Sequence, residues 1–134
     1  MKGFIFSILL LVSINNCNQE AINIKYVAQT RGFFLQVDIE ANIIKVVNER
    51  GGVPLERELS TIELERLKKI STKADFENVE TLERSKSTYD AAAMASLQVM
   101  TNESEYLFEF DHGYPPEKLE ELVNKIITLS EIVE

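Results

Sequence analysis

The sequence predicts an α+β domain in the order βββ-α-ββ-α, with an antiparallel sheet of about five strands and two helices packed on one face. Three observations support this fold class. Three early segments alternate apolar and polar residues and are joined by short links. A capping signal opens an amphipathic helix near residue 60. A second pair of alternating segments precedes two prolines and a long apolar stripe.

The first three expected strands lie at residues 22–28, 33–39 and 43–47. Apolar residues alternate with polar ones in the first two, and β-branched residues dominate the third. The links between them are too short for parallel crossovers, so the pattern predicts an antiparallel meander. Gly51, Gly52 and Pro54 are expected to end this meander.

Ser60 and Glu63 form a capping-box pattern, which predicts that a helix begins directly after Ser60. Its expected apolar side consists of Leu59, Ile62, Leu67, Ile70 and Ala74. Residues 75–83 could extend this helix or pack irregularly over the core, and residues 84–90 are polar and are predicted to form a loop.

A β-hairpin is expected next, although residues 91–95 are rich in alanine and have high helix propensity. Alternation at residues 97–101 and 106–110, around a turn signal at Asn102, outweighs that propensity. The alanines would then pack closely beneath something bulky. Pro116 suits the first turn of a closing helix. The stripe of this helix is Leu119, Leu122, Val123, Ile126, Ile127 and Val133.

The amino terminus has the pattern of an export signal. Lys2 is followed by an apolar run from Phe4 to Val12, which is about half of the roughly 20 residues needed to span a membrane. The only cysteine, Cys17, follows this run, and the segment Ile14-Asn15-Asn16-Cys17 resembles the lipidation box of a bacterial lipoprotein signal. Two asparagines stand where that pattern usually has small residues.

This resemblance implies that Cys17 carries the lipid and is the first mature residue. The expected organisation is a signal peptide at 1–16, the lipidated cysteine and a short tether at 17–23, and a single α+β domain at 24–134. More than one acyl chain, such as palmitate, gives stable anchoring in a membrane. The expected location is the bacterial cell envelope, most simply the outer membrane, on its periplasmic or surface face.

Composition excludes several classes of function. The chain has 14 basic and 22 acidic side chains and a net charge of −8, which argues against nucleic acid as a partner. A single cysteine excludes an internal disulfide framework, and no zinc-ligand spacing or phosphate-binding glycine loop is present. The sequence therefore predicts no cofactor, no metal and no catalytic residue.

His112 is the only imidazole and the only candidate general base. A hydrolase would pair it with a serine and with Asp111 or Asp90, but no nucleophile elbow is present. Asp111 and His112 are adjacent, so their side chains diverge if the strand continues through them. A structural role, in which His112 bonds a backbone carbonyl in the turn before the last helix, is the more ordinary interpretation.

Two stretches have the character of a binding patch: Gln29-Thr30-Arg31-Gly32 and the segment from Phe110 to Pro116. Prolines, a glycine and a tyrosine can present side chains with little loss of entropy. The candidate patch consists of Arg31, Asp90, Asp111, His112 and Tyr114. If Arg31 lies near Asp111, either a charged patch joins the two stretches or a single ion pair pins the sheet edge.

With its export signal, Cys17, Q-T-R-G (29–32) and F-D-H-G-Y-P-P (110–116), the chain resembles small bacterial lipoproteins of unknown function. Its order of elements is also similar to that of emfourin-like inhibitors of metalloproteases, although T-R-G-F (30–33) does not match their glycine-rich motif. The leading expectation is a non-enzymatic, membrane-tethered binding or structural module of the envelope, whose partner is a protein or a glycan. A metalloprotease inhibitor and an envelope hydrolase that uses His112 are the alternatives.

Overall fold

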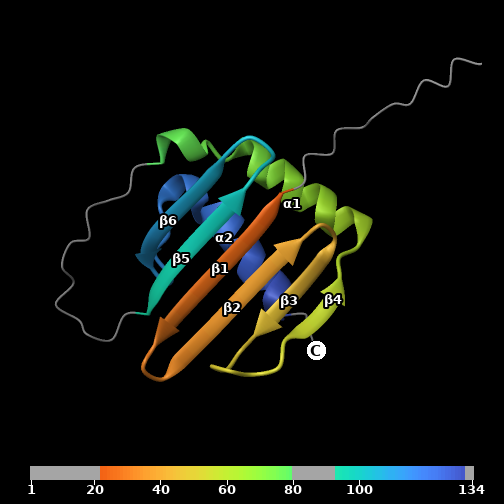
Figure 1. The fold of residues 1–134 in the computed structure, drawn as a ribbon. Helices are drawn as coiled ribbons and strands as arrows, with labels where there is room; N and C mark the ends of the chain where they lie inside the picture. Colours follow the sequence, from red (N-terminus) through yellow and green to blue (C-terminus); the bar gives the residue numbers. More distant parts are fainter. Residues whose placement is uncertain (1–21, 80–92, 132–134) are drawn as a thin grey trace, which may run out of the picture.

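Six strands form one antiparallel sheet, and two helices cover one face of it (Figure 1). The computed structural model describes residues 22–79 and 93–131. Within these ranges the α+β class is confirmed, with six strands where about five were expected. The elements are β1 (Asn23–Thr30), β2 (Phe33–Glu40), β3 (Ile43–Val47), β4 (Leu55–Glu58), α1 (Thr61–Lys73), the short 3-10 helix η1 (Phe76–Asn78), β5 (Met94–Met100), β6 (Glu105–Asp111) and α2 (Glu117–Glu131).

The order of strands across the sheet is β4-β3-β2-β1-β5-β6, and every neighbouring pair is antiparallel. β1 is therefore central, with β2 on one side and β5 on the other. The expected meander of the first three strands and the expected hairpin of β5 and β6 are both confirmed. The hairpin docks beside β1 because the alternating face of β5 completes the core.

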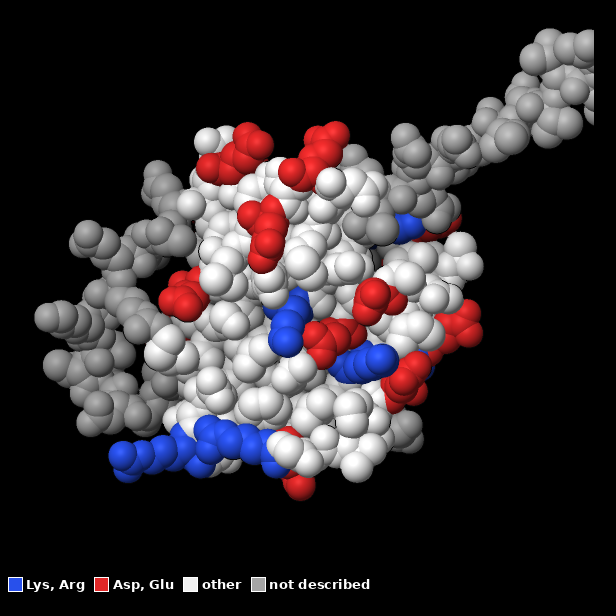
Figure 2. Space-filling model, viewed as in Figure 1, with Lys and Arg blue, Asp and Glu red and all other residues white. Residues whose placement is uncertain are grey.

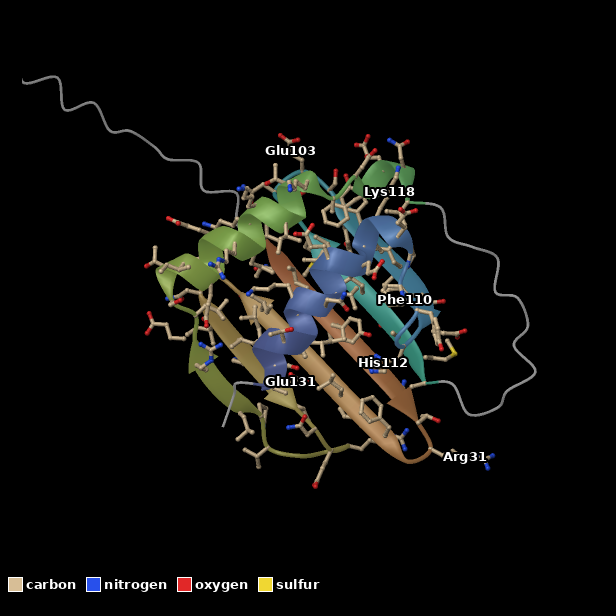
Figure 3. The ribbon with its side chains drawn as sticks, turned by 180° about the vertical axis from the view of Figure 1, so that it is seen from behind. Arg31, Glu103, Phe110, His112, Lys118 and Glu131 are labelled. Carbon is tan, nitrogen blue, oxygen red and sulfur yellow. The ribbon has the colours of Figure 1, made fainter. Side chains whose placement is uncertain are left out.

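The core lies between the helices and the alternate residues of the strands that face them. Figure 3 views the molecule from this side, with both helices in front of the sheet. Ala95 is 1% exposed and pairs with Ala28 on one side and Phe110 on the other, so this alanine does pack beside a bulky ring. The largest fully buried side chains are Tyr26, Ile39, Ile44, Leu97, Leu119, Leu122, Ile126 and Leu129.

Two expectations about the first half of the chain were wrong in detail. The meander does not end at Pro54, because β4 adds a fourth strand that pairs with β3. Its four residues are mostly charged and carry no alternating apolar signal, so tertiary pairing and not local pattern creates it. Ile62 does not belong to the buried side of α1, because its side chain is 64% exposed while Leu67 is buried.

The capping box is confirmed, since the backbone N–H of Glu63 donates to the Ser60 hydroxyl and the N–H of Ser60 donates to the Glu63 carboxylate. No helix in the described ranges has both the length and the apolar character needed to cross a membrane. The predicted signal, tether and Cys17, the predicted loop at 84–90 and the last stripe residue, Val133, lie outside the described residues.

Candidate functional site

The two ends of the sheet carry different parts of the chain. We call one the tether end: β1 begins there at Asn23, and the turns at Ala41–Asn42 and Asn102–Glu103 lie there. We call the other the loop end: β1 turns into β2 at Arg31–Gly32, β3 leads into the loop at 48–54, and β6 leads into the segment at 112–116. Most candidate patch residues belong to the loop end, so the strand register brings the two predicted stretches to one end of the molecule.

His112 is held at the loop end by the core (Figure 3). Its Nδ1 lies 2.7 Å from the hydroxyl of Tyr26, a side chain that is 0% exposed. The His112 backbone N–H donates to the carbonyl of Ala93 at 2.8 Å, which extends the pairing of β5 with β6 by one residue. The ring also lies 5.3 Å from that of Phe33. The expected partner, a backbone carbonyl, is therefore replaced by a buried tyrosine hydroxyl.

Burial fixes the protonation states of this pair. It raises the pKa of Tyr26 to about 12, because a phenolate without water is unfavourable. It also lowers the pKa of His112 below its ordinary value, because the imidazolium is the form that burial penalises. At neutral pH both groups are therefore uncharged, and the ring tautomer decides whether the Tyr26 hydroxyl donates to Nδ1 or accepts from it.

Asp111 and His112 diverge, as expected for neighbours on a strand. Asp111 pairs in register with Met94, which lies on the sheet face that the helices leave open, whereas His112 bonds Tyr26 on the helix-covered side. In a serine hydrolase a carboxylate accepts the Nδ1 proton of the histidine. Here Nδ1 faces a hydroxyl, and Asp111 points to the other side of the sheet. The geometry of this pair gives a hydrolase no support.

Arg31 and Tyr114 are the exposed members among the four patch residues that the structure describes. Arg31 lies in the turn between β1 and β2, and Figure 3 shows its side chain reaching away from the sheet. It forms no ion pair with Asp111 or with any other residue in the part of the chain that the structure describes. The Tyr114 side chain is 81% exposed, and its backbone N–H donates to the carbonyl of Asp111. The structural alternative, an Arg31–Asp111 pair that pins the sheet edge, is therefore wrong.

Exposed apolar side chains gather at the loop end. Seven large hydrophobic side chains are exposed in the described ranges, and five of them lie there: Phe33 (40%), Val53 (86%), Leu55 (39%), Met94 (41%) and Tyr114 (81%). These side chains lie on both faces of the sheet and from β4 at one edge to the segment after β6 at the other, so they surround the loop end together with the Arg31 guanidinium, which forms no ion pair with a described residue. Sequence reasoning missed all of them except Tyr114. The one available signal was Phe33-Phe34, which breaks the alternation of the second strand.

A cavity of about 290 Å³ lies at the same end, between the β1–β2 turn and the loop after β3. The Arg50 guanidinium donates to the carbonyl of Thr30 and so ties the two loops together. The loop after β3 is tight: Gly52 N–H donates to the Glu49 carbonyl at 2.9 Å, and Gly51 has a φ of 70°. The cavity is lined by Arg31, Gly32, Phe33, Phe34, Asn48, Glu49 and Arg50.

No group of three or more metal-ligating side chains occurs among residues 22–79 and 93–131. Asp90 lies outside the described residues, so the structure does not place this member of the candidate patch. A scan of protein-family models and searches of curated proteins and solved structures found no match for this chain.

Proposed function

We propose that this protein is a non-enzymatic binding module of the bacterial cell envelope, tethered to a membrane through lipidated Cys17, and that its loop end receives the partner. The observation that supports this proposal is the gathering of exposed apolar side chains and Arg31 at the end of the sheet farthest from the start of β1. Tyrosine and arginine are residue types that often carry binding energy at protein interfaces.

The path of β1 supports the assignment of the loop end. The proposed tether at 17–23 leads directly into β1, whose eight residues extend about 26 Å at a rise of roughly 3.3 Å each. A domain anchored at Cys17 would therefore hold the Arg31 turn at the end away from the membrane. The face closest to the anchor would be the tether end, and the face open to a partner would be the loop end.

Charge is distributed unevenly between the two ends, and repulsion of the tether end would keep the domain from lying flat on the membrane. The tether end carries the exposed carboxylates of Glu40, Glu58, Glu103 and Glu105, while arginines lie at the loop end. Figure 2 shows the opposite ends of the open sheet face as red and blue, respectively. Carboxylates next to an anionic lipid surface are repelled from it over about a Debye length, so the domain would stand off the membrane.

The anchor is tested by expressing the full chain and its Cys17→Ser variant in a bacterial host that is fed labelled palmitate. We expect the wild-type chain to carry the label and to sediment with membranes, and the variant to lose both properties. Label on the variant, or membrane association equal to that of the wild type, would refute the lipid anchor.

Partner binding is tested by capture from envelope extract on residues 18–134, coupled through the amino terminus to imitate the tether. The test variant carries Arg31→Ala and Tyr114→Ala, both exposed at the loop end. The matched control carries Ile62→Ala and Arg66→Ala, an exposed apolar residue and an exposed arginine on α1. We expect a partner that binds the wild type and the control and is lost from the test variant. Equal capture by all three would move the site elsewhere, and no capture would refute the binding module.

A further inference from the structure

The cavity at the loop end suggests what kind of partner the module takes, an inference that rests on the proposed function. We propose that this cavity binds an acidic segment of a partner protein through one aromatic side chain, with Arg31 and Arg50 pairing with carboxylates on either side of that ring. The lining and charge of the cavity support this assignment, and its size permits it.

The cavity is large enough for a single side chain. It measures about 290 Å³, at the lower limit of the roughly 300–1,000 Å³ common for small-ligand pockets. It is a widely open hollow between two surface loops, so a ligand in it would stay in contact with solvent. One phenylalanine or tyrosine ring fits a space of this size, and the rest of the partner would lie outside it, across the loop end.

The lining favours an aromatic ring. Phe33 and Phe34 are consecutive at the start of β2 and both contribute to the lining, with their side chains directed to opposite faces of the sheet. Phe33 is 40% exposed, and Phe34 is half-buried on the open face. Aromatic rings that pack in offset or edge-to-face geometry gain about 0.5–1.5 kcal/mol beyond the area that they bury. A guanidinium over an inserted ring adds a cation–π contact.

Charge favours carboxylates next to that ring. The protein as a whole carries −8, but the cavity is lined by two arginines and one glutamate. Arg50 uses one Nη2 hydrogen for the Thr30 carbonyl, and Arg31 forms no ion pair with a described residue. A guanidinium presents several donors in a plane that matches a carboxylate. Both guanidinium groups can therefore donate to a carboxylate without breaking an existing ion pair.

The rest of the open sheet face lacks this local excess of positive charge. In one cross-strand row Lys25 faces Asp38, Asp38 faces Lys45, and Lys45 faces Glu56. The charges of neighbouring strands therefore alternate and compensate each other in the middle of the face. An acidic segment would be attracted to the loop end and would meet mixed charge beyond it, which limits the contact to the cavity and its rim.

The test uses amide chemical shifts of isotope-labelled residues 18–134, a chain that contains every described strand and helix, during titration with acetylated pentapeptides. The first peptide has a central Phe flanked by two Asp and two Glu; the second replaces the Phe with Ala, and the third replaces the acids with Lys. We expect saturable shifts at residues 30–34 and 48–50 with the first peptide alone. We expect Arg31→Gln to weaken this binding about three- to fivefold, because exposed ion pairs contribute up to about 1 kcal/mol. Lys25→Gln removes the same charge from the middle of the open face and should leave the affinity unchanged.

Any of four results would overturn the proposal. The lysine peptide binds as tightly as the acidic one, or Arg31→Gln binds the acidic peptide as tightly as the wild type. The amide shifts are confined to other elements, or none occurs at millimolar peptide. The outcome is independent of the capture experiment. If capture depends on Arg31 and Tyr114 but the acidic peptide does not bind, the module stands and its partner has another chemistry. If the peptide binds but no envelope protein is captured, the cavity chemistry stands and the proposed function fails.

Discussion

The hydrogen bond between Tyr26 and His112 joins the buried core to the loop end, and Tyr26→Phe removes it while keeping the ring. The hydroxyl lies 2.7 Å from Nδ1 on a residue that is 0% exposed. The change deletes one buried hydroxyl and leaves the half-buried Nδ1 of His112 without its partner. It introduces no steric conflict, because phenylalanine has the same ring as tyrosine and lacks only the hydroxyl oxygen.

The expected cost follows from these contacts. An intramolecular hydrogen bond contributes about 0.5–1.5 kcal/mol, and a buried group that loses its partner costs about 1–3 kcal/mol. Since Nδ1 is only partly buried, we expect Tyr26→Phe to lower the free energy of unfolding by about 1–2 kcal/mol. In a domain of this size that corresponds to a decrease of about 4–8 °C in Tm. Thermal and chemical unfolding both measure it.

The same substitution should change the titration of His112. In the tautomer whose Nδ1 accepts from the Tyr26 hydroxyl, the bond exists only with the neutral ring, so its loss should raise the pKa of His112 toward the ordinary value. In the wild type burial lowers this pKa, so His112 contributes stability above pH 6.5 that is lost as the pH falls through the lower folded value. This loss should be smaller in Tyr26→Phe. His112 is the only histidine in the chain, so its ring protons give an unambiguous nuclear magnetic resonance titration.

Tyr106→Phe is the matched control, because the Tyr106 hydroxyl has no hydrogen bond to a described residue. It removes the same oxygen from a half-buried ring on β6 and should change neither the stability by more than about 0.5 kcal/mol nor the His112 titration. If Tyr26→Phe behaves like this control in both measurements, the bond does not hold His112 at the loop end and the reasoning fails.

Three further substitutions test local features. Ala41 has a φ of 54°, so Ala41→Gly should relieve backbone strain and raise the unfolding free energy by up to about 1 kcal/mol in denaturant titrations; a decrease would contradict this. Gly113 has a φ of 93° and open space around its Cα, so Gly113→Ala should cost about 1–2 kcal/mol through backbone strain alone, and an unchanged Tm would count against it. Two hydrogen bonds lower the pKa of the Glu63 carboxyl: one from the Arg57 guanidinium at 2.9 Å and one from the backbone N–H of Ser60. Glu63 therefore contributes stability above pH 4.5, and this stability is lost as the pH falls through the lower pKa that Glu63 has in the folded protein. Glu63→Ala should cost about 1 kcal/mol at neutral pH and reduce this acid sensitivity, which unfolding at pH 7 and pH 3 would show.

The sequence predicted elements whose signals are local. Ser60 and Glu63 located the start of α1 because a capping box acts within four residues. Alternation outweighed alanine propensity in β5, because burial of Leu97 and Val99 against the helices stabilises a strand more than helix propensity stabilises a helix. β4 had no such signal: it exists because β3 offers an edge, and Leu59 and Asn42 hold its far end by a 2.7 Å backbone hydrogen bond.

The candidate site was predictable only where turn chemistry exposes a residue. Arg31 and Tyr114 stood out because a glycine turn and a proline-rich segment place them at the surface. Only the strand register brings three further residues to this end: Phe33, Arg50 and Met94. Gln29 pairs with Phe34, the neighbour of Phe33, on one side and with Met94 on the other, and Arg50 donates to the Thr30 carbonyl at the end of β1. Register depends on which faces are buried in the folded sheet, and an isolated segment does not contain that information.

β1 connects the two halves of the functional proposal. The strand follows the proposed tether directly and ends at the turn that carries Arg31, so its length of about 26 Å separates the anchor from the cavity. This distance is about three Debye lengths at physiological salt, so an anionic lipid surface would act on the carboxylates of the tether end and scarcely on the arginines. An anchor placed instead in the β1–β2 turn would leave the fold and the cavity chemistry intact but would turn the cavity toward the lipid. The proposed function therefore depends on the direction of one strand as well as on the residues at its end.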